Sequence, residues 1–157
     1  MKVQHLLLIL LLCQLSACAP KTTPIKNSFD YVRTGKVNVI SSDKGLLSVK
    51  CEGMAENLNK AILFAEMNAL ENILYRGIPG SNQEAPLIPD ELDAYKKNQL
   101  VLDNLVFRNG YKNYITGSEI IERHDANGIF VVQKVTFDVP ALRKYLENNN
   151  IIRKFGL

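Results

Sequence analysis

One segment of the sequence, residues 54–76, limits the folds open to this chain more than any other. Apolar residues recur in it at steps of three and four, which is the spacing of one face of an α-helix. The members of this face are Leu58, Ala61, Ile62, Ala65, Ala69, Leu70, Ile73 and Leu74. Because several of them are alanines, we expect the helix to lie close to a sheet. Gly77 and Pro79 predict where the helix ends.

Four further segments carry the pattern of β-strands. Residues 36–42 and 46–52 are rich in Val, Ile and Leu, and Ser42-Asp43-Lys44-Gly45 between them favours a turn. Residues 114–123 and 129–139 form a second pair, joined through Asn127-Gly128, the sequence most typical of a tight hairpin. In the last strand one face is apolar throughout, which predicts that this face is buried: Ile129, Val131, Val135, Phe137 and Val139.

Two more helices complete the expected fold. Pro89-Asp90-Glu91 is typical of a helix start, and the pattern continues to Arg108. Pro140 opens a third helix with Leu142, Tyr145 and Leu146 on its inner side. The order predicts an α+β domain. Its antiparallel sheet has about four strands in two hairpins, with the long helix and two further helices packed mainly on one face.

The N-terminus is typical of an export signal. Lys2 is followed by an uninterrupted Leu and Ile run over 6–12, too short to span a membrane, and then by Leu15-Ser16-Ala17-Cys18. Leu-Ser-Ala-Cys resembles the lipobox of bacterial lipoproteins, which implies cleavage before Cys18 and lipidation of Cys18. An ordinary signal peptide with a chance cysteine is the alternative. We therefore expect a signal peptide over 1–17, a lipidated flexible tether over 18–35 and one globular domain over 36–157.

The expected location of the domain follows from the same segment. Several acyl chains on one residue give stable anchoring without a membrane span. Ala19 and Pro20 follow the cysteine, where an aspartate would favour the inner membrane in other lipoproteins. This likeness implies a lipid anchor in the outer membrane with the domain facing the periplasm. The chain carries a net charge of +3, and losing Lys2 leaves about +2. Such a balance predicts no nucleic-acid partner.

The residues offer little for catalysis. His124 is the one histidine left after the signal, and its place beside the 125–128 turn favours a solvated residue over a proton carrier. Cys51 is then the one cysteine with a free thiol, and its apolar strand context favours a buried structural residue over a reactive one. Glu66 and Glu71 are five positions apart and fall on different helix faces, so they predict no acid–base pair. We therefore expect that the protein is not an enzyme and that it holds no metal ion and no cofactor.

Two segments are candidates for binding a protein partner. The connection from Arg76 to Pro89 is longer than most, and long ordered loops are often functional. Its candidate partner-binding residues are Arg76, Gly77, Ile78, Pro79, Gly80 and Ser81. A plain connector is the alternative interpretation. The basic and apolar C-terminus, residues 143–155, is the second candidate, with a tail docked on its own domain as the alternative.

Parts of the sequence resemble two known protein families. The strand 46–52, Gly53 and the helix with Ala61, Ala65, Asn68 and Ala69 resemble the N-terminal domain of flagellar assembly protein T. Residues 114–146 resemble the same family, which implies the same α+β fold. The lipobox, the domain size and the run 76–81 ahead of Pro86-Leu87-Ile88 are similar to the small lipoprotein of type VI secretion systems in Bacteroidota-like bacteria.

These resemblances imply a function. The chain is expected to be a membrane-anchored periplasmic lipoprotein that serves as a non-enzymatic structural or docking subunit of a trans-envelope assembly, namely type VI secretion. The alternative is a periplasmic lipoprotein that binds a small molecule or a glycan. No catalytic residue is carried over from either family.

Overall fold

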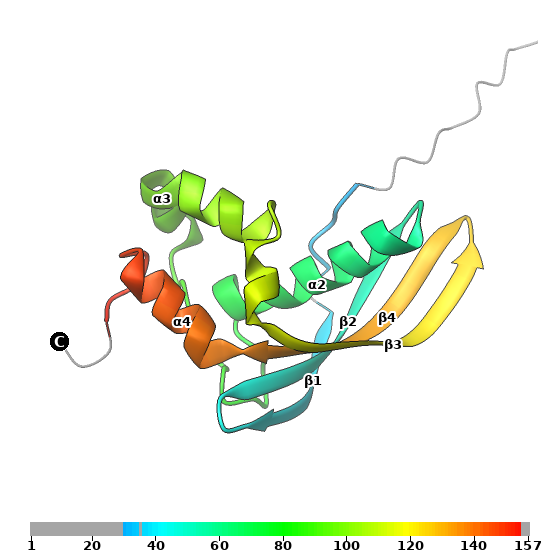
Figure 1. Cartoon of the computed structure of the whole chain (residues 1–157), viewed down its shortest axis with the longest axis horizontal. Coiled ribbons are helices and arrows are strands. Elements are labelled where there is room, and N and C mark those ends of the chain that lie inside the picture. Colours follow the sequence, from blue (N-terminus) through cyan, green and yellow to red (C-terminus); the bar gives the residue numbers. More distant parts are fainter. Residues whose placement is uncertain (1–29, 35, 155–157) are drawn as a thin grey trace, which may run out of the picture.

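The computed structural model describes residues 30–34 and 36–154. The signal peptide, Cys18 and most of the expected tether lie outside these residues. The described part contains a four-stranded antiparallel sheet in the order β1-β2-β4-β3, with helices packed against it (Figure 1). The elements in chain order are β1 (Val37–Asp43), β2 (Leu46–Ala55), α2 (Leu58–Tyr75), α3 (Glu91–Val106), the 3₁₀ helix η2 (Gly110–Tyr114), β3 (Ile115–Ala126), β4 (Gly128–Asp138) and α4 (Val139–Asn148). The predicted α+β class is confirmed.

Helix α2 lies across β2 and β4 and supplies the centre of the core. It begins later than residue 54, because β2 continues to Ala55 and Asn57 caps the helix by accepting the Lys60 N–H at 2.9 Å. It ends at Tyr75, and Gly77 follows with φ +76° and an N–H that donates to Asn72 O at 2.8 Å. The predicted stop at Gly77 is therefore confirmed, with its usual physical cause.

The close contact between α2 and the sheet depends on Gly53. A Cβ atom on this residue would lie 2.1 Å from Ala61 O and 2.5 Å from Ala65 N, inside the backbone of the helix. The small residues of α2 and the glycine of β2 thus let the two backbones approach each other. Leu70, Ile73 and Leu74 then fill the core beside this contact.

The two hairpins differ at their tips. In the β1–β2 turn, Lys44 and Gly45 both have positive φ, 49° and 84°, as expected for a two-residue turn. In the β3–β4 hairpin, Ala126 pairs with Gly128, so Asn127 stands between them by itself. The second hairpin lies where it was predicted. Its turn is tighter than a two-residue one, and there the positive φ belongs to Gly128 at 133°.

Strand β3 differs from the other strands in its burial. Every residue from Thr116 to Ala126 is exposed, including Ile120 and Ile121. Helix α2 covers β2 and β4 and stops short of β3. Figure 1 shows that the far end of the β3–β4 hairpin extends beyond the helix. Two shifts of register, near Thr116 and near Ile121, bend this strand along its length.

Residues 31–34, which the sequence analysis placed in the tether, lie against α2. The Tyr31 ring packs on Phe64 with a centroid distance of 5.3 Å, and its hydroxyl donates to Glu71 Oε2. The Thr34 N–H donates to Asn68 Oδ1 at 3.1 Å. The folded unit therefore includes these residues. Within the described ranges, no helix has the length and apolar character needed to cross a membrane.

Candidate functional site

A cavity of about 470 Å³ opens between α2, α3 and the segment that precedes β1. We call it the α2–α3 cavity. Its walls combine charged groups at one end with aromatic and aliphatic side chains at the other, namely Arg33, Glu71, Tyr75, Glu91, Leu92, Tyr95, Val106 and Phe107. Its size falls within the range of small-molecule sites, about 300–1,000 Å³.

The charged end of the cavity is organised by Arg33. Its Nε lies 2.9 Å from Glu71 Oε2, and its Nη1 lies 2.6 Å from Glu91 Oε1. The guanidinium also lies over the Tyr75 ring, 5.5 Å from the centroid. One residue of the N-terminal segment thereby joins α2 to α3, because Glu71 belongs to the first helix and Glu91 to the second.

Glu71 is the most unusual group of this site. Its side chain is 5% exposed, and its second oxygen, Oε1, is buried with no hydrogen-bond partner among the described residues. Burial raises the pKa of Glu71, while the contacts with Tyr31 and Arg33 act in the opposite direction. A buried carboxylate oxygen without a donor costs free energy, and because this atom has almost no accessible surface it is not open to a ligand in the cavity.

The other end of the cavity is apolar and open to solvent. Leu92 and Phe107 are 66% and 55% exposed, which is high for large apolar side chains. Tyr95 also lines the cavity, and its hydroxyl donates to Asp103. A ligand in this cavity would therefore meet charged groups that are paired with one another, together with aromatic and aliphatic side chains.

The second carboxylate of α2, Glu66, has a closed environment. It accepts the Tyr111 hydroxyl at 2.9 Å, and Lys112 Nζ lies 3.6 Å away. The prediction that Glu66 and Glu71 form no pair agrees with their separate partners. The burial of both was missed, because α2 is covered by the sheet on one side and by α3, η2 and the N-terminal segment on the other.

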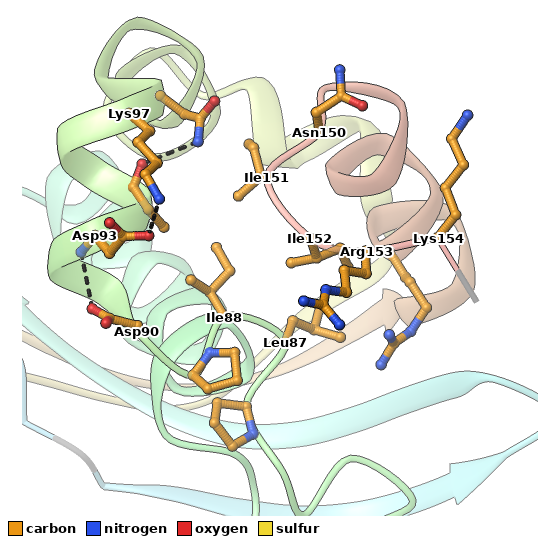
Figure 2. A pocket seen from close by; sticks show the side chains of 15 residues that line it. Leu87, Ile88, Asp90, Asp93, Lys97, Asn150, Ile151, Ile152, Arg153 and Lys154 are labelled. Carbon is orange, nitrogen blue, oxygen red and sulfur yellow. Dashed lines mark hydrogen bonds and ion pairs between the residues drawn. The ribbon is translucent and has the colours of Figure 1, made fainter. Parts of the chain in front are cut away.

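A groove of about 720 Å³ separates the start of α3 from the chain that follows α4 (Figure 2). Leu87, Ile88, Ile151 and Ile152 are among its apolar members, and Arg153 and Lys154 lie along one rim. On the other rim Asp93 is already paired with Lys97 at 2.7 Å, as Figure 2 shows. The described part of the predicted C-terminal tail is docked: Ile151 and Ile152 pack against the core. Phe155 lies outside the described residues.

The predicted partner-binding loop is folded onto the end of α2. Ile78 is buried, Ser81 Oγ donates to its carbonyl at 2.7 Å, and Gly77 lies so close to Glu84 O that no side chain fits. Arg76, Pro79 and Gly80 are exposed. The loop and the α2–α3 cavity use different residues, so the structure brings none of the six candidate residues into the cavity.

The remaining candidates stand where the sequence placed them. Cys51 is buried in β2, its thiol donates to Gln133 O at 3.5 Å, and burial raises its pKa to about 12. His124 is exposed on β3 and stacks on Phe130 with a centroid distance of 6.1 Å. Among the described residues, no group of three or more His, Cys, Asp or Glu side chains has the geometry of a metal site.

Comparison with protein-family models found no match, and comparisons with curated proteins and with solved structures found no significant match.

Proposed function

We propose that this protein is a lipoprotein held in the outer membrane by Cys18, with its domain in the periplasm as a non-enzymatic docking subunit of a trans-envelope assembly. The lipobox-like Leu15-Ser16-Ala17-Cys18 supports the anchor. The specific assembly we propose is a type VI secretion system. The support for it is the resemblance of the lipobox, the domain size and the 76–81 run to the small lipoprotein of those machines.

The observation that carries the docking function is the exposed strand β3. It is the last strand of the sheet, and its outer edge is paired with no strand among the described residues. Backbone N–H and C=O groups along such an edge can receive a strand from another protein. The side chains of Ile120 and Ile121 add apolar surface to this edge.

Features of the same strand favour pairing with a specific partner over aggregation through the sheet edge. The two register shifts interrupt the edge, and Glu119, Glu122 and Arg123 place charges along it. Charges and bulges of this kind oppose aggregation between edges. The exposed part of the 76–81 loop, Arg76, Pro79 and Gly80, is the second surface that we propose for a partner.

The test is co-purification from detergent-solubilised membranes of the native host. Wild-type protein is expected to bring down subunits of the secretion machine, and Cys18→Ser is expected to lose them. Ile121→Asp should reduce the recovery as well, because it places a charge on the β3 edge. Ile40→Asp is the matched control, since Ile40 is an equally exposed isoleucine on the opposite edge strand, β1. Equal recovery with Ile121→Asp and Ile40→Asp would remove β3 from the proposal.

The α2–α3 cavity favours a second candidate function, a lipoprotein that binds a small molecule. The support is its volume together with a lining that combines charged and aromatic side chains. A thermal-shift screen of the detergent-solubilised full chain, covering glycans, amines, alcohols and carboxylic acids, tests this candidate. Stabilisation by none of these classes would exclude it in favour of docking.

A further inference from the structure

We propose that the outer edge of β3 receives an extended segment of another protein in which basic and apolar side chains alternate, with the basic ones opposite Glu119 and Glu122. This inference names the chemical class of the partner and rests on the docking function proposed above. The edge is paired with no strand among the described residues, so its backbone groups are open to an added strand.

The register shift at Ile121 brings two carboxylates onto the same face of the sheet. Glu119 pairs with Lys134 of β4. Glu122 pairs with Val132, because Ile121 stands between the paired residues without a partner on β4. Residues 132 and 134 are two positions apart, so they and their partners on β3 point to the same face. In a regular strand, residues three positions apart would lie on opposite faces, and the bulge removes this difference.

The charge at the edge is negative on this face. Glu119 is exposed and forms no ion pair with any other described residue. Glu122 lies 3.5 Å from Lys50 of β2, but the two side chains are 48% and 40% exposed, and water screens such a pair. An added strand would lie directly beside β3 and would meet the two carboxylates first. Opposite charges directly across neighbouring strands stabilise their pairing, which favours basic residues at these two positions.

The other face of the edge suits apolar side chains. Ile120 pairs with Gln133, and the neighbours of Gln133 on the same face, Val131 and Val135, are buried in the core that α2 covers. Ile120 therefore points to the helix side of the sheet, where it is 39% exposed. An apolar residue beside it would remove this surface from water. Alternation of basic and apolar residues in the partner follows from the two faces.

A second copy of the chain fits this edge poorly. Antiparallel pairing of two β3 strands with their bulges facing each other is centred between Ile120 and Ile121. This pairing sets Glu119 opposite Glu122 of the second copy, at two places related by symmetry. Like charges directly opposite each other destabilise a strand pair. The edge therefore favours a segment of a different protein.

The experiment titrates synthetic peptides into the isotope-labelled full chain in detergent and follows the backbone amide signals by NMR. The peptides are Thr-Lys-Val-Lys-Val-Lys-Thr and two versions in which glutamine or glutamate replaces each lysine. The lysine peptide is expected to shift the amide signals of β3 and to leave those of β1 unchanged. It should bind at least about threefold more tightly than the glutamine peptide, and the glutamate peptide at least about threefold more weakly.

A charge-reversal variant tests the role of the carboxylates. Glu119→Lys should bring the affinities of the lysine and glutamate peptides to within about twofold of each other. Glu52→Lys is the matched control, since Glu52 is a carboxylate on the same face of the sheet, in β2, two strands away from β3. This control should keep the order of the peptides. Glu119 is exposed, so the variant is expected to fold, which circular dichroism checks.

The other outcomes overturn the inference in distinguishable ways. Equal binding of the peptides, or a preference for lysine that survives in Glu119→Lys, would exclude the proposed class of partner and leave strand addition at β3 in place. Shifts of β1 amide signals in place of those of β3 would exclude the proposed edge. Binding of no peptide would also overturn the inference. The docking function is decided separately, by the co-purification of Ile121→Asp against Ile40→Asp.

Discussion

Replacement of Gly53 by alanine tests the close backbone contact between β2 and α2. The new methyl group would lie 2.1 Å from Ala61 O and 2.5 Å from Ala65 N, both backbone atoms of α2. Since a side-chain rotation cannot remove this overlap, the helix itself has to move away from β2. Overpacking of a core costs about 1–3 kcal/mol, and we expect about 3 kcal/mol here because the displaced atoms belong to the backbone.

The assay is urea unfolding of the full chain in detergent, followed by circular dichroism. A loss of about 3 kcal/mol also corresponds to a fall in Tm of roughly 10 °C for a domain of this size. Gly117→Ala is the matched control. It too is a strand glycine without positive φ, and its nearest neighbour would be Thr136 Oγ1 at 3.8 Å. We expect this control to stay within about 0.5 kcal/mol of wild type. Equal stability of the two variants would refute the reasoning.

Three further predictions follow from single residues. Burial raises the pKa of Glu71 above its ordinary 4.5, so the native state holds this proton more tightly than the unfolded state. The free energy of unfolding should therefore fall as pH rises from about 4.5 through the raised pKa. Glu71→Gln should flatten this pH dependence, measured by urea titrations. An unchanged pH dependence in the variant would contradict the raised pKa of Glu71. Cys51, buried and with a pKa of about 12, should react with a thiol reagent only after unfolding, and rapid reaction of the native protein would show that it is accessible. Asp138→Ala removes the side chain that accepts the Ala141 N–H at 2.9 Å and should cost about 0.5–2 kcal/mol, whereas Asp138→Asn should retain most of the cap.

The elements that the sequence predicts well are those with local causes. The three–four spacing from Leu58 to Leu74, the turn at Lys44-Gly45 and the helix that opens with Pro140 each depend on residues close together in the chain. One boundary was displaced because a neighbouring element continued. The start of α2 moved because β2 extends through Met54 and Ala55 to pair with β4.

The candidate site depends on contacts that no local pattern contains. Glu71 was considered with Glu66 and set aside, because five positions separate them and they fall on different faces of the helix. The apolar pattern of α2 indicates one buried face and says nothing of what covers the opposite side. In the fold that opposite side is covered by α3 and by the segment around Tyr31 and Arg33, 40 and 38 positions earlier in the chain. The available signal was an aromatic residue close to an arginine in a stretch otherwise assigned to a tether. The assignment used the composition of the whole stretch, in which these two residues carry little weight.

The attachment of residues 31–34 also decides where a mechanical load enters the domain. A pull on the chain from the N-terminal side reaches Tyr31 and Arg33 before it reaches β1. Their contacts with Glu71, Asn68 and Glu91 distribute the force between two helices. Without them the same pull would act first on Val37, at the end of an edge strand that can be peeled from β2 one residue at a time. The N-terminal segment therefore protects the edge of the sheet against tension.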